Sequence, residues 1–347
     1  MRRSLSVLGI VIVLGLGLGV WHPSRVGVQA LLLLPDIFPA APVDPLGWLA
    51  SEPKRTEHAF QYAAGTIQAD IFHPASGGRH GAVVLLPGVG EMPRIDLALR
   101  FAEALARSGV VVMLPQSTGL LAERLTFDEV DGLRRCFDLL QAQSDVDANR
   151  TGFIGLSAAG GLSIVAAAQS DLRERVRLVS SLGGYYDATA LLLDAASRSI
   201  DVDGQVQPWV PDQRTLDVID NALSDALGGT SPARAYLQSG ISREQARALI
   251  EALPPSARER LATISPSHYL GSLRAHLYLL HDTDDSFVPF TQSRELVRAA
   301  PPGIVQRFTE FSIFAHVVPN RPVAWPSFLH DVWSLYWDVH AVLLELL

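Results

Sequence analysis

Short apolar runs alternate with longer amphipathic runs from about Ala59 to the C-terminus, and this alternation restricts the possible fold more than any other feature of the sequence. Continuous apolar runs that end at glycine or proline are typical of buried strands, and residues 81–88 (GAVVLLPG) are an example. Strands that alternate with helices of about 10–15 residues indicate a mostly parallel α/β sheet with helices on both faces. The expected strands are residues 60–64 and 66–72, which look like a hairpin, and then 81–88, 110–115, 151–157, 177–184, 276–281 and 305–311. The expected helices include residues 97–109, 126–143 and 158–169.

The strand pattern stops between Tyr186 and about Tyr269. This stretch contains helix-like segments such as TLDVIDNALSDAL and REQARALIEAL. A loop of this length without secondary structure of its own is rare in a compact domain. We therefore expect residues 187–269 to form a helical cap over the C-terminal edge of the sheet.

The composition is that of a large globular domain. Hydrophobic residues make up 48% of the 347 residues and charged residues 18%, which is enough apolar material for a sizeable core. The formal net charge of −8 gives no electrostatic reason to expect nucleic acid as a partner.

No sequence pattern implies a metal or an organic cofactor. The single cysteine, Cys136, excludes an internal disulfide and a metal site built from several cysteines. It lies in a helical pattern and is expected to be a core residue. The sequence has no H-E-x-x-H motif, no P-loop, and no G-x-G-x-x-G after a strand.

The N-terminus carries an apolar segment that predicts a membrane anchor over residues 1–25. Between Ser4 and Ser24 there is no Asp, Glu, Lys or Arg, and a helix from Leu5 to Trp21 would be about 25 Å long, slightly short of a typical hydrocarbon core. Trp21 ends the run where an interfacial aromatic residue is expected. Two arginines before the segment against one after it favour a location of the bulk of the chain on the extracytoplasmic side.

A cleavable signal peptide is the alternative for this segment, and it would give a secreted protein. Residues 28–30 (Val-Gln-Ala) form a passable cleavage site, although they lie well beyond the apolar run. After the anchor, closely spaced prolines predict a tether over residues 26–55. The globular domain is expected over residues 56–347.

Residues 155–161 (GLSAAGG) form the central motif of the chain. An apolar strand runs directly into Ser157 and a helix of small residues leaves it, which is the strand–turn–helix arrangement of a nucleophile elbow. The tight turn requires small neighbours, and Gly155 and Ala159 meet this requirement. The alternative is a glycine-rich crossing between strand and helix with an inert serine.

With this motif the chain resembles the α/β-hydrolase superfamily, and the resemblance extends from about Ala59 to the C-terminus. Alanine at position 159 departs from the usual glycine of the family, which tolerates this change. Residues 86–90 (LPGVG) look like the oxyanion loop of the family. The resemblance implies that the backbone N–H groups of Val89 and Ala158 form an oxyanion hole; the alternative is a simple Pro-Gly turn.

The segment HLYLLHDTDDSFVP resembles the family pattern strand-HG-x-x-D-x-x-VP. The preceding residues 265–270 also resemble this region in esterase, dienelactone-hydrolase and prolyl-oligopeptidase relatives. Alignment on Val288 and Pro289 places the catalytic acid at Asp285. Asp282 then occupies the glycine position, and Asp284 is the nearest competitor. Three aspartates in four residues are also compatible with a solvated turn or a weak cation site.

His316 follows the last expected strand, where the family has its general base. The order Ser, Asp, His is the order that this fold uses. His281 is the only close rival, but it ends a strand at a position where the family often has a histidine without a catalytic role. His22, His330 and His340 are expected to be structural.

The resemblance therefore implies a serine hydrolase in which Ser157 attacks, His316 accepts the proton and Asp285 orients the imidazole. Hydrolysis of a small-molecule carboxylic ester through an acyl-serine is the leading hypothesis. Acyl transfer, peptide cleavage with the same residues, and a non-catalytic binding protein are the alternatives.

Apolar residues recur at helical spacing near the C-terminus, in FLHDVWSLYWDVHAVLLELL. We expect this segment to be the last helix of the fold, packed on the sheet. Contact of its tryptophans with a membrane is the alternative.

Overall fold

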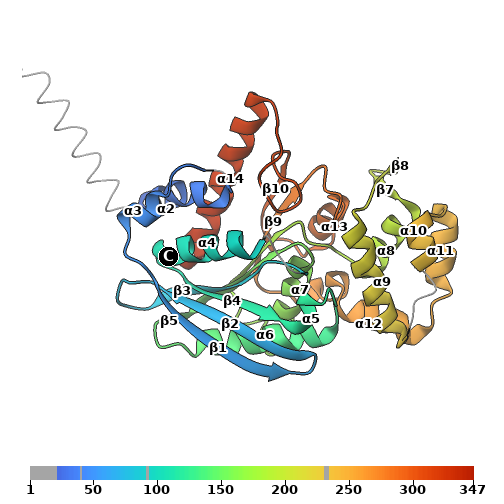
Figure 1. Cartoon of the computed structure of the whole chain (residues 1–347), viewed down its shortest axis with the longest axis horizontal. Coiled ribbons are helices and arrows are strands. Elements are labelled where there is room, and N and C mark those ends of the chain that lie inside the picture. Colours follow the sequence, from blue (N-terminus) through green and yellow to red (C-terminus); the bar gives the residue numbers. More distant parts are fainter. Residues whose placement is uncertain (1–21, 40, 91–93, 230–233) are drawn as a thin grey trace, which may run out of the picture.

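The computed structural model describes residues 22–39, 41–90, 94–229 and 234–347. An eight-stranded sheet with the strand order β1-β2-β4-β3-β5-β6-β9-β10 runs through the domain (Figure 1). The first two pairings, β1 with β2 and β2 with β4, are antiparallel, and the other five are parallel. The strands are β1 (Lys54–Tyr62), β2 (Gly65–His73), β3 (His80–Leu86), β4 (Val111–Ser117), β5 (Val146–Leu156), β6 (Leu178–Leu182), β9 (His276–Asp282) and β10 (Val305–Phe311). The mostly parallel sheet and the initial hairpin are thus confirmed.

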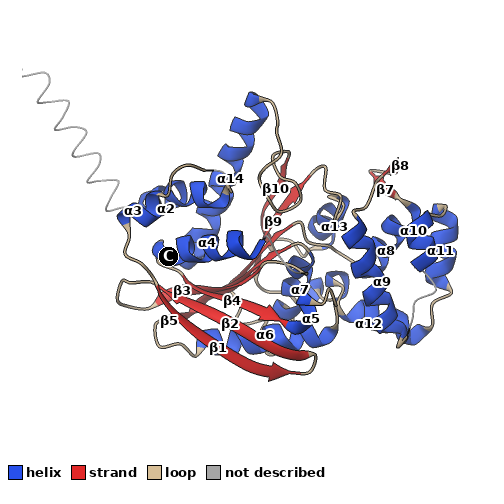
Figure 2. Cartoon of the chain, viewed as in Figure 1, coloured by secondary structure: helices blue, strands red, loops and turns tan. Residues whose placement is uncertain are grey.

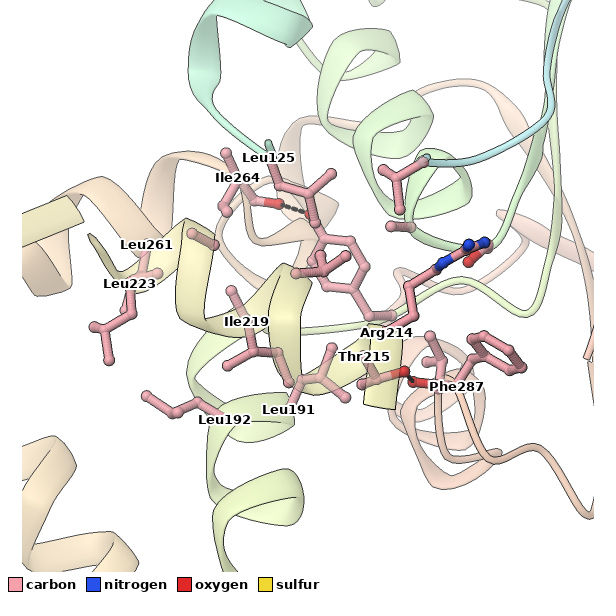
Figure 3. A pocket seen from close by; sticks show the side chains of 18 residues that line it. Leu125, Leu191, Leu192, Arg214, Thr215, Ile219, Leu223, Leu261, Ile264 and Phe287 are labelled. Carbon is pink, nitrogen blue, oxygen red and sulfur yellow. Dashed lines mark hydrogen bonds between the residues drawn. The ribbon is translucent and has the colours of Figure 1, made fainter. Parts of the chain in front are cut away.

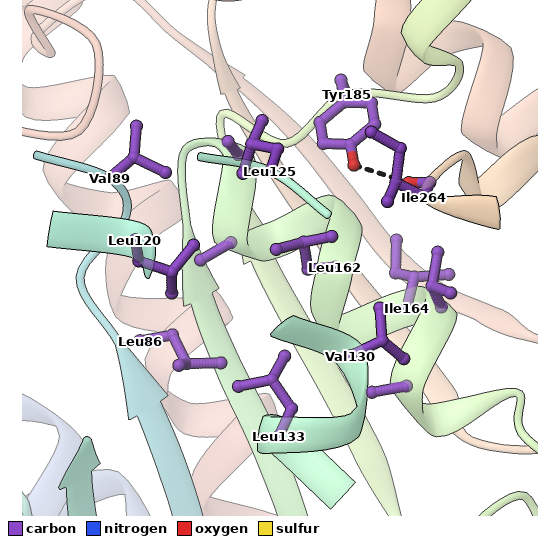
Figure 4. Close-up of a cluster of buried hydrophobic side chains, with 14 of the residues drawn as sticks. Leu86, Val89, Leu120, Leu125, Val130, Leu133, Leu162, Ile164, Tyr185 and Ile264 are labelled. Atoms are coloured by element: carbon purple, nitrogen blue, oxygen red, sulfur yellow. Dashed lines mark hydrogen bonds between the residues drawn. The ribbon is translucent and has the colours of Figure 1, made fainter. Parts of the chain in front are cut away.

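Helices cover both faces of the sheet, which explains why its central strands are apolar without alternation. In β3, Val84 and Leu86 point into the cluster that contains α6 (Phe127–Gln141) and α7 (Ala158–Ala167), and Figure 4 shows Leu86 in this cluster. Val83 and Leu85 point to the other face, where α4 (Arg94–Arg107) and α14 (Trp325–Leu346) pack. Every residue of β3 after His80 is therefore buried.

The expected cap is present and mainly helical, and it extends beyond the sheet (Figure 2). A two-stranded hairpin that the sequence pattern did not indicate follows its first helix. The cap elements are α8 (Ala188–Ser197), β7 (Ser199–Val202), β8 (Gln205–Pro208), α9 (Gln213–Leu227), α10 (Arg234–Ser239), α11 (Arg243–Glu251) and α12 (Pro255–Thr263). The remaining short elements are α3 (Pro45–Leu49), α5 (Thr118–Leu121), α13 (Thr291–Ala299) and the 3₁₀ turns Pro266–His268 and Leu270–Ser272.

The predicted tether over residues 26–55 is wrong at its start, because residues 22–37 form helix α2 (His22–Ile37). Val26, Ala30 and Leu33 are buried between α4 and α14, and this packing outweighs the proline in the helix. That proline, Pro35, lies in the last turn of α2, where it disrupts little of the hydrogen-bond ladder. The segment is part of the domain rather than a free linker.

The predicted anchor over residues 1–25 lies mostly outside the described residues, and its last four residues belong to α2. The possible cleavage site at residues 28–30 also lies within α2. No helix in the described part of the chain combines the length and apolar character needed to cross a bilayer.

Candidate active site

Ser157 occupies the turn between β5 and α7, so the strand–turn–helix arrangement expected there is present. Its backbone has φ 57° and ψ −141°, a region that non-glycine residues enter only at a cost of about 1–3 kcal/mol. A Cβ atom at Gly155 would lie 2.7 Å from the carbonyl oxygen of Ala159, and one at Gly160 would lie 2.2 Å from Ser181 Oγ. The small residues of the motif are therefore required by the close approach of strand and helix.

Asp285 and His316 form a buried pair beyond the C-terminal ends of the strands. The Nδ1–H group of His316 donates to Asp285 Oδ2 at 2.6 Å. Phe287 stacks on the imidazole with 4.6 Å between ring centroids. The second ring nitrogen, Nε2, is buried and has no hydrogen-bond partner among the described residues. The imidazole is thus held at one nitrogen and open at the other.

The end of β6 brings His316 beside the turn that carries Ser157. The N–H of Ser157 donates to the carbonyl of Leu182 at 2.8 Å. A Cβ atom on the next residue, Gly183, would lie only 3.1 Å from His316 Cε1. The three residues named from the sequence, Ser157, Asp285 and His316, therefore gather at one edge of the sheet.

The surroundings of Asp285 favour its ionised form. Burial alone raises the pKa of this carboxyl, but the charge of His316 and hydrogen bonds from His281 and His316 outweigh burial and hold the pKa well below its ordinary value. Oδ1 also accepts hydrogen bonds from the backbone N–H groups of Phe287 (2.7 Å) and Val288 (3.1 Å). The carboxylate is fixed by these contacts before any substrate binds.

The other two aspartates of the loop have different surroundings. Asp282 is buried, and both of its oxygens accept from Arg321, at 2.8 and 2.7 Å. Asp282 also accepts the backbone N–H of His316 at 3.2 Å, so it supports the base through the backbone. The side chain of Asp284 is 88% exposed. The loop is therefore not a simple solvated turn, since Asp284 alone of its three aspartates faces solvent.

His281 lies beneath the acid and has both ring nitrogens engaged. Its Nε2–H donates to the carbonyl of Val288 at 2.8 Å, and its Nδ1 lies 2.6 Å from Ser293 Oγ. The same Nε2 is 3.5 Å from Asp285 Oδ2. His281 thus braces the acid loop from within the core.

A pocket with an empty volume of about 700 Å³ opens beside Ser157 and extends under the cap (Figure 3). Val89 and Ala158 line it next to Ser157. Val89 lies between Gly88 and Gly90, whose φ angles are 111° and 87°. Ala158 is the first residue of α7, so its N–H has no acceptor within the helix. The other lining residues are Leu125, Tyr185, Ala188, Leu191, Leu192, Arg214, Thr215, Val218, Ile219, Ala222, Leu223, Leu261, Ile264, Phe287 and Val288.

The cap is tied to the loop that carries Asp285 by three hydrogen bonds. Trp209 Nε1–H donates to the carbonyl of Asp285 at 2.8 Å, and the N–H of Asp212 donates to the carbonyl of Ser286 at 2.7 Å. Thr215 Oγ1 donates to the carbonyl of Phe287 at 3.0 Å, a bond drawn in Figure 3. These contacts and the Arg321–Asp282 ion pair were not predicted from the sequence. No local motif indicates them, because the two partners of each contact lie far apart in the chain.

No family model and no curated protein matches the sequence. Among solved structures, the chain is similar to 2,6-dihydroxy-pseudo-oxynicotine hydrolase (TM-score 0.53, 17% identity), covering 87% of this chain and 73% of that one. It is also similar to puromycin hydrolase (TM-score 0.54, 17% identity, 87% and 40% covered) and to Pyrococcus horikoshii acylaminoacyl peptidase (TM-score 0.52, 14% identity, 86% and 41% covered). The chain therefore spans well under half the length of the latter two proteins. At these identities the comparison establishes the fold, and the chain has the α/β-hydrolase fold.

Proposed function

We propose that the protein is a serine hydrolase that cleaves a carboxylic ester through an acyl-serine intermediate. The observation that carries this proposal is the His316 imidazole, which is bonded to buried Asp285 through Nδ1 and left open at Nε2, beside the strained turn that carries Ser157. A base oriented in this way, next to a strand–turn–helix that carries a serine, is the arrangement that activates the serine.

In the proposed reaction, Ser157 Oγ attacks the ester carbonyl carbon while its proton passes to His316 Nε2. Asp285 stabilises the imidazolium that forms. The carbonyl oxygen becomes an oxyanion that accepts from the N–H groups of Val89 and Ala158, which line the pocket beside the serine. The intermediate collapses, the C–O bond breaks, and the alcohol leaves with the proton from His316. Water then attacks the acyl-serine in the same way, which releases the acid and restores the serine.

The pocket supports an apolar acyl group as substrate. Its wall beneath the cap is formed mainly by aliphatic side chains, such as Leu191, Val218 and Ile219. Arg214 is the charged residue in the lining, and its guanidinium lies 3.2 Å from the carboxylate of Glu123. An alkyl or aryl acyl chain would bury its surface here without leaving a polar group unpaired.

Cleavage of an amide bond by the same residues is the second candidate. The similarity to an acylaminoacyl peptidase and to puromycin hydrolase favours it. Parallel assays with p-nitrophenyl esters and p-nitroanilides that share one acyl group distinguish the two candidates. We expect turnover of the ester to exceed that of the anilide.

The experiment that tests the proposal is labelling with a fluorophosphonate probe. Wild-type protein should be labelled covalently, and Ser157→Ala should lose the label without loss of the native circular dichroism spectrum. Ser163→Ala is the matched control, because Ser163 lies on α7 and its hydroxyl donates within that helix, to the carbonyl of Ala159 at 2.7 Å. Undiminished labelling of Ser157→Ala would refute the assignment.

The location of the protein stays a prediction from the sequence. The N-terminal segment, residues 1–25, is proposed to hold the domain on the extracytoplasmic side of a membrane, and the alternative is a signal peptide that is removed during secretion.

A further inference from the structure

Helix α14 carries a stripe of large apolar side chains on its outer side. Trp325, Leu329, Trp333 and Trp337 recur every four residues and therefore lie along one side of the helix. Their exposed fractions are 70%, 61%, 61% and 39%. We refer to these four residues as the aromatic stripe.

The exposed side of α14 carries no Asp, Glu, Lys or Arg side chain, although the helix is 22 residues long and described in full. Its acidic residues are all turned inward: Asp331 accepts from the backbone of Ser312 and Ile313, Asp338 binds Arg307, and Glu345 binds Arg177 and His276. His330 is the exposed titratable residue. A helix that faces water normally shows charged residues on its outer side. The aromatic stripe therefore resembles a surface that another molecule or a membrane covers.

The aromatic stripe adjoins the first helix of the described chain. The ring of Tyr336 packs against Trp333 and Trp337, with centroids 5.6 and 5.1 Å away. A Cβ atom at Gly27 of α2 would lie 2.9 Å from Tyr336 Oη, so the two helices touch there. The outer side of α2 adds Val28 and Leu31, which are 56% and 61% exposed. In Figure 1 the N-terminal half of α14 projects from the domain.

The sequence that leads into α2 is itself apolar. From Ser4 to Trp21 it contains no charged residue, and it ends one residue before α2 begins. His340 Nε2 lies 3.2 Å from the carbonyl oxygen of Pro23, so the chain enters the domain beside the stripe. The sequence that precedes α2 is thus joined to the domain next to the tryptophan-rich outer side of α14.

We propose that the aromatic stripe, with Val28 and Leu31 of α2, lies in the interface of a lipid bilayer. Tryptophan favours this region because its ring is apolar while its N–H remains available to water and headgroups. The face offers no charged side chain that would pair with a protein partner, and Arg25 is its one exposed basic neighbour on α2. Binding should therefore not require anionic lipid and should persist at high salt concentration.

Quenching of tryptophan fluorescence by brominated phosphatidylcholine tests this proposal. The chain has six tryptophans. The full chain carrying Trp21→Phe and Trp48→Phe retains the three of the stripe and Trp209, which is only 8% exposed. On vesicles with brominated acyl chains this protein should lose most of its emission relative to unbrominated vesicles. This readout reports where the stripe lies, whether or not the N-terminal segment also binds lipid.

Two matched proteins complete the experiment. When Trp325, Trp333 and Trp337 are also changed to Phe, the remaining emission of Trp209 should not respond to bromine. Addition of Val210→Trp to that protein places a fluorophore two residues after β8, at a site that is 72% exposed. Strand β8 lies away from α14 in Figure 1, and this fluorophore too should not be quenched.

Three results would overturn the proposal. In the first, the chain binds the vesicles in a flotation assay, but the fluorescence of the stripe tryptophans is not quenched. In the second, the chain does not bind phosphatidylcholine vesicles. In the third, sedimentation without lipid shows a dimer that Trp333→Ser dissociates, which would assign the face to a second copy of the chain. Leu329→Asp combined with Trp333→Asp should reduce quenching while the circular dichroism spectrum stays native.

Discussion

The position of Asp285 is fixed mainly by backbone groups rather than by other side chains. The amides of Phe287 and Val288 hold one carboxylate oxygen, which leaves the other directed at His316. Because the amides belong to the same short loop, the acid is oriented as soon as the loop folds.

Asp285→Asn should therefore lower kcat strongly, by about 10⁴-fold on the serine-protease precedent, with little change in KM. An amide in place of the carboxylate favours the wrong imidazole tautomer and cannot stabilise the imidazolium. Asp284→Asn is the matched control, since its side chain is exposed, and should change kcat less than about twofold. Steady-state kinetics on a p-nitrophenyl ester checks both. A larger effect at Asp284 would move the acid by one residue.

The sequence indicated the three residues of the proposed triad, which the structure gathers at one edge of the sheet, but not the residues that support them. Ser157 could be predicted because small residues must surround a tight turn, and Asp285 because the Val288–Pro289 pair marks the loop. The ion pair between Arg321 and Asp282 could not be predicted, because it joins two segments that meet only in the folded protein. The same applies to Trp209, whose role depends on where the cap folds back.

Among the elements, the strands and main helices followed the hydrophobic pattern because each buries a continuous apolar face. Helix α2 was not predicted, because the density of prolines in residues 35–45 indicated a segment without regular structure. Tertiary packing of a short apolar face outweighs that local preference. The β7–β8 hairpin was missed because its strands have only four residues each, and such short strands show almost no periodic pattern in the sequence.

Leu33→Ala should lower the free energy of unfolding by about 2–5 kcal/mol, because Leu33 is fully buried where α2 meets α4 and α14. Leu31→Ala, on the exposed side of the same helix, should change it by less than about 0.5 kcal/mol in the absence of lipid. Urea unfolding measures both. Equal effects would mean that α2 is not part of the cooperative core.

Helix α9 should set the length of the acyl group, because Val218 projects into the pocket under the cap. Val218→Trp should reduce kcat/KM for long-chain p-nitrophenyl esters by about 10- to 100-fold relative to the acetate. Val206→Trp, in the exposed strand β8 of the cap and outside the pocket lining, is the control and should leave the ratio unchanged. A melting curve shows whether the larger residue is tolerated. An unchanged chain-length profile in Val218→Trp would place the acyl group elsewhere.

At the scale of the whole molecule, buried carboxyl groups make stability depend on pH. Burial is the main cause that raises the pKa of Asp36, Asp194 and Asp338 from 3.8 to about 6. Between about pH 4 and 6 the folded protein keeps protons that the unfolded chain has released, so stability should fall as pH rises through this window and level off above it. Asp285 acts in the opposite sense, because its lowered pKa stabilises the fold above about pH 4 and this contribution is lost as pH falls.

Asp338→Asn should make the pH dependence less steep. Asp338 is almost fully buried, and its raised pKa corresponds to at most about 3 kcal/mol at neutral pH. Urea unfolding at intervals from pH 4.5 to pH 7.5, values chosen to cover the window set by the raised pKa of about 6, measures the slope in both proteins. Identical slopes would show that Asp338 does not titrate in this range.

The three hydrogen bonds between the cap and the acid loop have a consequence for which molecules the proposed enzyme can process. An outward swing of α9 would break them and release the carbonyls of Asp285 and Phe287 from their partners. A small ester that enters with the cap in place meets the loop of Asp285 with all three cap hydrogen bonds made, whereas a bulky ester that displaces the cap meets this loop without them. Oversized esters should thus be disfavoured twice, by lack of space under the cap and by a less firmly held loop around Asp285.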